Sequence, residues 1–247
     1  MSLTWVIEPA AFEHQDVALA VAAKAAGHRV ALWDDMSPLR GLNGKRVVFH
    51  GSLNVASRGL EMGWQPGVWC NAAGFSFSSY AEQLQPWLLN SSYQASTVRE
   101  QLMACGQRFV RPDSPLKQFA GQIVDRPTAM QLGLGFYHDD LDLPVIVAPV
   151  VDIDHEWRFV VVAGRPVSWC GYVASTRSAN DSFSADALAL ASEVAAAFDA
   201  PDPVYVLDVA ETPRGIKLVE ANPFSGADLY DCPCEPIVAA IGRLLQL

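Results

Sequence analysis

The first 90 residues alternate short apolar strands with helical stretches, and this order constrains the fold more than any other feature. TWVIE (Thr4–Glu8) and HRVALWDD (His28–Asp35) predict two strands. Apolar residues at helical spacing from His14 to Gly27 predict a helix between them. A strand–helix–strand order implies a parallel sheet with a right-handed crossover. The same pattern predicts further strands at Lys45–Ser52 and Gly67–Gly74 and helices at Asn54–Met62 and Tyr80–Leu89. We therefore expect an open α/β domain at residues 1–90.

The pattern changes after residue 90, where hairpins replace the alternation. Glu156–Val173 predicts two strands around an Ala-Gly-Arg-Pro turn, and Val204–Phe224 predicts a second hairpin. Other strands are expected at Arg108–Pro112 and Asp142–Asp152, and helices at Ser184–Ala200 and Pro236–Leu245. Antiparallel hairpins with helices predict an α+β domain at residues 91–247.

Composition and charge exclude several classes of protein. The formal net charge is −10, from 17 Lys and Arg against 27 Asp and Glu, and no basic tract occurs. Nucleic-acid binding and attraction to anionic membranes are therefore not expected. No apolar run approaches the roughly 20 residues that span a bilayer, and the first residues do not have the pattern of a signal peptide. Five scattered cysteines suggest reduced thiols and a cytoplasmic protein.

The second hairpin carries the strongest candidate site. If its turn is centred on Arg214, Asp208 faces Glu220 directly, and Asn222 lies on the same face. Two facing carboxylates repel unless a cation lies between them, and oxygen ligands of this kind suit Mg²⁺. The alternative is an edge hairpin whose acids are solvated. In either case we expect Glu220 to lie outside the core.

Three cations in the same half of the chain could bind an anion. Arg111 ends a strand, and Lys117, one of only four lysines, follows in a Pro- and Ser-containing turn. Arg158 interrupts the apolar strand EWRFVVV, where a guanidinium is costly to bury unless it meets an anion. The alternatives are solvated side chains for Arg111 and Lys117, and for Arg158 an internal ion pair with Glu156 or another acid. A weaker motif, Cys232-Pro-Cys234, could bind a metal or could be an ordinary loop beside the last helix.

The motifs EWRFVVVAGRPV and VLDVAETPRGIKLVEANPFSGADLY resemble those of ATP-grasp proteins. FVRPDSPLKQFAG further resembles the compact ATP-grasp clade named for two arginines and a lysine. The resemblance covers residues 91–247, with a small lobe at about 91–146 and a large lobe at about 147–247 that enclose the nucleotide. Residues 1–90 would be the preceding α/β domain. The chain departs from the family in its phosphate lid, which has Gly121 in place of a glycine-rich loop, and in having one small-lobe lysine instead of two.

The resemblance implies a role for particular residues. Mg²⁺ ligands would be Asp208, Glu220 and Asn222. ATP would be bound by Arg111, Lys117, Val147, Ala148, Val150, Val151 and Arg158. Arg158, Lys117 and Arg177 would be the catalytic cations.

The family also implies an activity. It would be an ATP-dependent, ADP-forming ligation of a carboxylate to an amine through an acylphosphate, with small molecules, amino acids or peptides as substrates. Two alternatives stay open: a nucleotide-binding regulatory protein with reduced catalysis, and an ATP-dependent phosphotransferase on the same fold.

Overall fold

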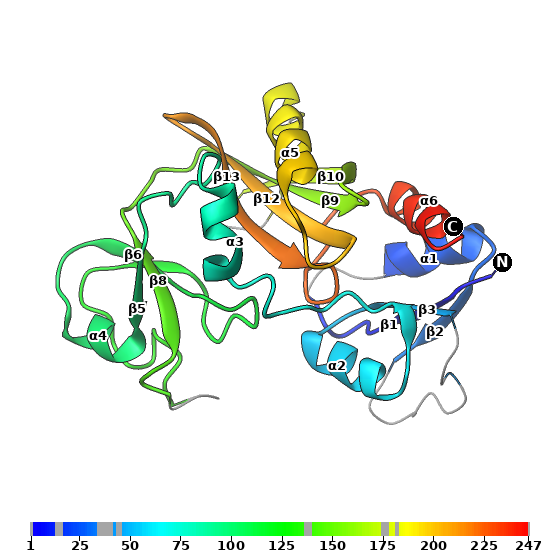
Figure 1. Cartoon of the computed structure of the whole chain (residues 1–247), viewed down its shortest axis with the longest axis horizontal. Coiled ribbons are helices and arrows are strands. Elements are labelled where there is room, and N and C mark those ends of the chain that lie inside the picture. Colours follow the sequence, from blue (N-terminus) through cyan, green and yellow to red (C-terminus); the bar gives the residue numbers. More distant parts are fainter. Residues whose placement is uncertain are drawn as a thin grey trace.

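The computed structural model describes residues 2–12, 17–33, 42, 46–135, 140–173, 178–180 and 183–246. Their strands form three sheets, which Figure 1 shows as successive parts of an elongated molecule. The first sheet is parallel and the other two are antiparallel, as the change of sequence pattern near residue 90 predicts.

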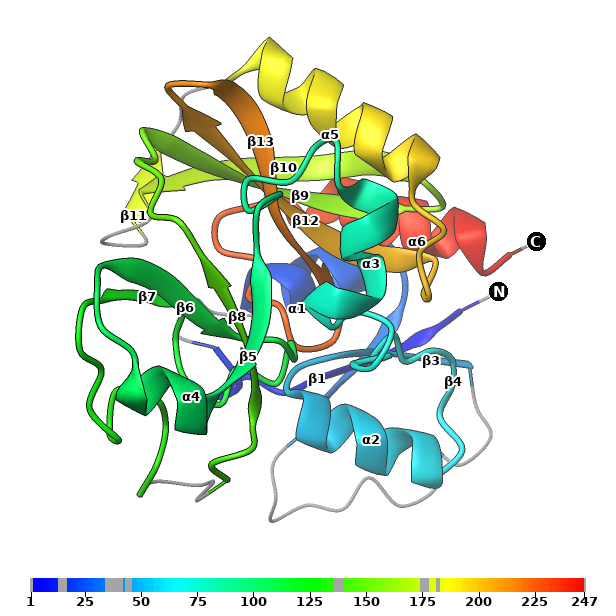
Figure 2. The ribbon, with the colours of Figure 1, turned by 60° about the vertical axis from the view of Figure 1, so that its left-hand side comes forward.

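The first sheet has the strand order β2-β1-β3-β4. Its elements are β1 (Thr4–Ile7), α1 (Val17–Ala25), β2 (Arg29–Leu32), β3 (Arg46–His50), α2 (Leu53–Glu61) and β4 (Gln65–Gly67). Trp5 and Ile7 of β1 face the core that contains α1, whereas Val6 between them faces the core that contains α2. This alternation places the two helices on opposite faces of the sheet, as Figures 1 and 2 show.

The second sheet has the order β5-β8-β6-β7. It consists of β5 (Gln94–Thr97), β6 (Arg108–Pro112), β7 (Gln122–Val124) and β8 (Pro144–Ala148), with α4 (Val98–Met103) beside it. The strand expected at Asp142–Asp152 ends at Ala148, because Pro149 has no N–H to donate to a neighbouring strand.

The third sheet has the order β11-β10-β9-β12-β13. Its elements are β9 (His155–Val162), β10 (Arg165–Val173), β11 (Ser178–Asn180), α5 (Ala185–Ala197), β12 (Val204–Thr212), β13 (Gly215–Pro223) and α6 (Cys234–Leu244). One face packs on α5 and on α3 (Phe77–Leu84); in Figure 2, α5 runs along the top of the sheet and α3 lies below α5.

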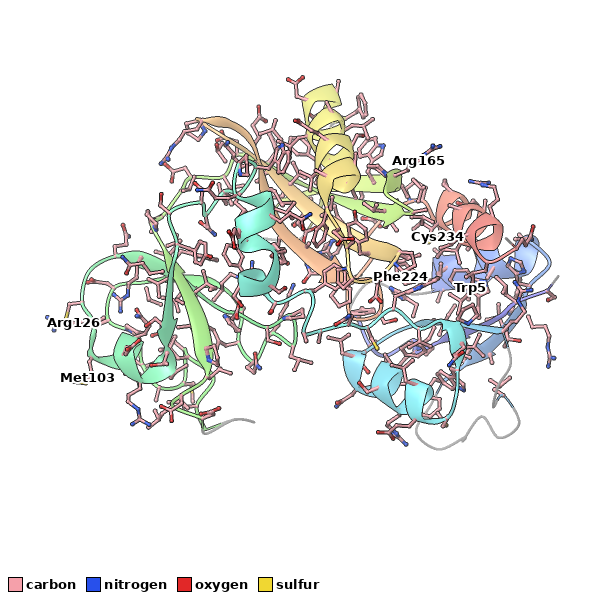
Figure 3. The ribbon with its side chains drawn as sticks, in the orientation of Figure 1. Trp5, Met103, Arg126, Arg165, Phe224 and Cys234 are labelled. Atoms are coloured by element: carbon pink, nitrogen blue, oxygen red, sulfur yellow. The ribbon has the colours of Figure 1, made fainter. Side chains whose placement is uncertain are left out.

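The opposite face of the third sheet packs on α6 and α1, so one hydrophobic core joins the first and third sheets. Trp5, Phe224 and Cys234 mark this core near the right-hand side of Figure 3, far from Met103 at the tip of the second sheet. On this face of the third sheet, the half nearer the second sheet carries charged side chains, and the rest is apolar. Those charged residues form the candidate site.

Two further expected elements differ from the structure. The run Gly67–Gly74 is not a strand: β4 ends at Gly67, and the carbonyl of Trp69 accepts from the N–H of Ser225 at 2.9 Å. The helix expected at Tyr80–Leu89 ends at Leu84, because the backbone of Trp87 and Leu89 pairs with Leu218 of β13. In both cases the backbone of the segment forms hydrogen bonds with residues in or next to β13, and the expected strand or helix does not extend through it.

Candidate active site

A cavity of about 520 Å³ lies between the second and third sheets. Its walls come from β6, the loop around residues 117–123, the connection 149–153, and the facing side of β9, β10, β12 and β13. Six charged side chains line it: Arg111, Lys117, Glu156, Arg158, Asp208 and Glu220. Three are cations and three are acids, so the cavity carries no large excess of either charge.

Asp208 and Arg158 form the most buried ion pair of this group. They are direct partners across the β12–β9 pairing. Nε of Arg158 donates to Oδ1 of Asp208 at 2.8 Å, and a terminal nitrogen donates to Oδ2 at 2.7 Å. Burial acts to lower the pKa of Arg158, but Asp208 raises it well above the usual value. Arg158 therefore forms an internal ion pair, which was the alternative expected from the sequence, and its partner is Asp208 and not Glu156.

Glu220 is surrounded by cations. Its Oε2 lies 2.5 Å from a terminal nitrogen of Arg111, and its Oε1 accepts from Nζ of Lys117 at 3.0 Å. Nδ2 of Asn222 also donates to Oε1, at 2.8 Å. Burial acts to raise the pKa of Glu220, but Lys117 and Arg111 together hold it well below the usual range. The expectation that Glu220 lies outside the core is wrong, because the residue is only 8% exposed.

Asp208 faces Glu220 because of a bulge in β13. The turn is Pro213–Arg214, closed by the pair Thr212–Gly215, so the hairpin is not centred on Arg214. A regular ladder from that turn would place Val219 opposite Asp208. The register shifts between Asp208 and Val209, which makes Val219 an extra residue and brings Glu220 opposite Asp208. The expected pairing is therefore correct, although the turn that we assumed is off by half a residue.

The alternative interpretation, an edge hairpin with solvated acids, is half correct: β13 is the edge strand of the third sheet, but the acids are not solvated. Asp208 is 1% exposed and Asn222 is buried on the same side as Glu220. Burial raises the pKa of Asp208, and the Arg158 guanidinium opposes that rise.

These residues fit a divalent cation held together with a phosphate group. Two carboxylates and an amide supply the oxygen ligands that Mg²⁺ prefers, but they are too few to complete its coordination. Across the described residues, no group of three or more His, Cys, Asp or Glu is placed to hold a metal ion, which also gives no support to a metal at Cys232 and Cys234. A metal here would need oxygens from a ligand.

Arg111 and Lys117 reach the cavity from the second sheet. Arg111 is buried at the end of β6, with Gly121 against it: a Cβ on Gly121 would lie 2.8 Å from Cζ of Phe109. A residue larger than glycine at position 121 would therefore have to displace the Phe109 ring. Lys117 has a φ of +48°, an uncommon conformation for a residue with a side chain, and is half exposed at the mouth.

The connection between the two sheets supplies an apolar wall. Val150 and Val151 line the cavity together with Pro149 and Ile153. Val147 and Ala148 lie one step earlier, within β8, and are outside the residues that line it. Arg177 falls outside the described residues.

Three residues that the sequence did not single out also line the cavity. Glu156, two residues before Arg158 on β9, is buried and hydrogen-bonded to Tyr172, its partner on β10. Burial raises the pKa of Glu156 to about 7. Tyr230 stacks over Arg158, with 4.4 Å from Cζ of the arginine to the ring centroid. The i, i+2 spacing of Glu156 and Arg158 could have identified the acid, but nothing in the sequence places Tyr230 here.

The solved structures that resemble this chain have the same architecture. A RimK domain ATP-grasp protein from Sphaerobacter thermophilus DSM 20745 matches with a TM-score of 0.64 and 13% identity, over 96% of this chain and 99% of that one. The ATP-grasp ligase PsnB, complexed with precursor peptide PsnA2 and AMPPNP, matches with 0.57 and 13%, over 98% and 96%. D-alanine–D-alanine ligase from Bacillus anthracis, complexed with ATP, matches with 0.58 and 10%, over 100% and 98%.

At these identities the solved structures establish the fold alone, which is that of ATP-grasp proteins. No curated protein matches the sequence. Among the described helices, none has the length and apolar character to cross a bilayer. One family model matches residues 26–244, and it describes the ATP-grasp domain of family 3 in the clade named for two arginines and a lysine. The chain therefore belongs to this clade of ATP-grasp proteins.

Proposed function

We propose that this protein is an ATP-dependent carboxylate–amine ligase whose nucleotide site is the cavity between the second and third sheets. The observation that supports it most is the convergence of Asp208, Glu220, Arg111, Lys117 and Arg158 on one cavity. Such a set can bind a triphosphate with Mg²⁺, since the cations contact phosphate oxygens and the acids hold the metal.

Different residues of the cavity would bind the metal and the phosphates. Asp208, Glu220 and Asn222 would hold Mg²⁺, which supplies positive charge beside the phosphates. Arg111 and Lys117 would exchange their contacts with Glu220 for contacts with phosphate oxygens. Phosphoryl transfer requires mainly positioning and charge stabilisation from the protein.

The remaining contacts would orient the nucleotide and the reacting groups. Arg158 is held at a fixed position by Asp208 and Tyr230, so its charge is preorganised for the transferred phosphoryl group. Val150 and Val151 would offer backbone groups and an apolar wall to the adenine, and Val147 and Ala148 would support that wall from the end of β8. Glu156 is placed to hydrogen-bond a ligand hydroxyl. Arg177 stays a proposed third catalytic cation.

We propose amino acids or peptides as the substrate class. PsnB is described with a precursor peptide, and D-alanine–D-alanine ligase is named for joining two amino acids. The carboxylate would accept the phosphoryl group, and an amine would displace phosphate from the acylphosphate. We also propose a cytoplasmic location, where ATP and reduced thiols are abundant.

An ADP-release screen tests the proposal. Purified protein with Mg²⁺ and ATP is given pools of amino acids and peptides, with and without added amines. Ligation predicts ADP release that needs a carboxylate, a trapped hydroxamate when hydroxylamine is added, and a condensed product when an amine is present. Phosphorylated product without amine consumption would instead establish a phosphotransferase. Tight ATP binding with no turnover in any pool would favour a regulatory protein.

A further inference from the structure

The buried thiols of Cys170 and Cys232 contact each other next to Arg158. Cys170 on β10 is the strand partner of Arg158, and Cys232 lies in the segment between β13 and α6. Their Sγ atoms are 2.8 Å apart, although 62 residues separate them in the chain. Both belong to the hydrophobic core that joins the first and third sheets.

Backbone carbonyls fix the position of both thiols. Sγ of Cys232 donates to the carbonyl of Arg158 at 3.7 Å, and Sγ of Cys170 donates to that of Leu229 at 3.6 Å. Cys234 is different, since its thiol donates to the carbonyl of Cys232 at 3.5 Å. The two sulfurs at 2.8 Å are therefore those of Cys170 and Cys232.

We propose that Cys170 and Cys232 form an intramolecular disulfide when the protein meets a peroxide. One thiol, as its thiolate, attacks the peroxide O–O bond and becomes a sulfenic acid, with release of one water. The second thiol then attacks that sulfur, forms the S–S bond and releases a second water. Hydrogen peroxide is reduced by two electrons, which the two sulfurs supply.

Burial of the two thiols should make this oxidation slow. The two residues are 7% and 3% exposed, and burial raises the pKa of the Cys232 thiol well above its usual value. The thiolate that reacts is therefore scarce, and large thiol reagents are excluded. A small oxidant can enter, so the pair should be resistant to alkylation yet slowly oxidised by hydrogen peroxide.

The disulfide would fasten the segment that holds Arg158. A terminal nitrogen of Arg158 donates to the carbonyl of Asp228, and the Tyr230 ring stacks on the same guanidinium. Tyr230 has a φ of +49°, and its N–H donates to the side chain of Asp228 at 2.9 Å. Cys232 follows this turn directly, so the bond would tie the turn to β10. This inference does not depend on the ligase proposal.

The test is peptide mapping of the full-length protein after treatment with hydrogen peroxide. The background is Cys105→Ser, because Cys105 is exposed and could link two chains. We expect a Cys170–Cys232 linked peptide, a loss of two hydrogen atoms, and a rise in Tm of roughly 5–10 °C that dithiothreitol reverses. Cys234→Ser is the matched control and should keep the bond, whereas Cys170→Ala and Cys232→Ala should lose it.

Peptide mapping of the parent protein tests for the Cys170–Cys232 disulfide even if an alanine variant does not fold. Retention of both free thiols after prolonged exposure to peroxide would overturn the inference. So would a Cys232–Cys234 link as the main product, or cysteines that advance only to sulfinic acid.

Discussion

Arg158 donates two hydrogen bonds to the carboxylate of Asp208, its direct partner across the pairing of β9 and β12. Their side chains are 4% and 2% exposed, so neither charge is solvated. The same carboxylate faces Glu220 on the opposite strand. Asp208 thus lies between a cation on one side and an acid on the other, and this arrangement leads to tests of both stability and ligand binding.

The buried pair should be sensitive to the loss of either charge. Arg158→Leu leaves Asp208 buried without its cation, so we expect the free energy of unfolding to fall by about 3–5 kcal/mol. Urea denaturation measures the change. Arg99→Leu removes the guanidinium from the exposed pair Arg99–Asp142, whose side chains are 56% and 76% exposed, and should cost less than about 1 kcal/mol. Equal effects of the two substitutions would contradict the role given to burial.

Lys117 should contribute to nucleotide binding and also to stability, because it pairs with the buried Glu220. Its side chain is half exposed, and Lys117→Met removes one charge from the cavity mouth. We expect the Kd for Mg-ATP to rise roughly 10–100-fold, equivalent to about 1.4–2.8 kcal/mol, under conditions where circular dichroism shows the variant folded. Lys217→Met is the matched control, since Lys217 lies on β13 but does not line the cavity. The prediction is wrong if both variants bind Mg-ATP as the parent does.

Glu156 should make stability depend on pH. The folded protein raises its pKa from 4.5 to about 7, because burial, with Asp208 and Glu220 nearby, outweighs Tyr172 and Arg158. Between these two pH values the folded state binds more protons than the unfolded state. The contribution of Glu156 to stability is therefore present below pH 4.5 and is lost as the pH rises through 7.

The loss amounts to about 3 kcal/mol for a shift of this size. Glu156→Gln removes it, so the variant should gain stability relative to the parent at pH 8 but not at pH 4.5. Urea denaturation at the two pH values measures the difference. A parent and a variant with parallel pH profiles would show that Glu156 does not titrate in this range.

Nucleotide and metal should bind as a unit. In the structure the carboxylates of Asp208 and Glu220 are engaged by Arg158, Arg111 and Lys117, which compete with a metal ion for the same oxygens. Phosphates would draw Arg111 and Lys117 away and expose Glu220 to the metal. Thermal shift should therefore give a rise of roughly 5–10 °C with Mg²⁺ and ATP at 100-fold excess over Kd. Mg²⁺ alone, or ATP with a chelator, should give clearly less; an equal shift with Mg²⁺ alone would contradict this coupling.

Much of the third sheet could be predicted from the sequence because its signals are local. Apolar strands around tight turns predicted both hairpins, whereas the Asp208–Glu220 pairing also needs the bulge in β13, which no local pattern predicted. The strands of the second sheet were harder, because β5 and β7 have only four and three residues. The helix after β5 does carry a readable signal, the capping box from Thr97 to Glu100.

Contacts distant in the chain could not be predicted. No local pattern places Tyr230 over Arg158, or the thiol of Cys232 beside Cys170. The ion pair between Lys117 and Glu220 joins residues 103 positions apart, one in the loop between β6 and β7 and the other on β13. The domain boundary at residue 90 stays a prediction, although α3, before that boundary, packs in the core of the third sheet.

We propose that Asp208, Glu220 and Asn222 hold a metal–nucleotide complex in the cavity between the second and third sheets. Titration calorimetry of Mg-AMPPNP with the parent protein and Glu220→Gln tests it most directly, since the glutamine keeps the shape of Glu220 and removes its charge. We predict binding to the parent protein, at least 100-fold weaker binding to the variant, and circular dichroism spectra that are the same for both. Equal affinity in the two proteins, or no binding to the parent, would contradict the account.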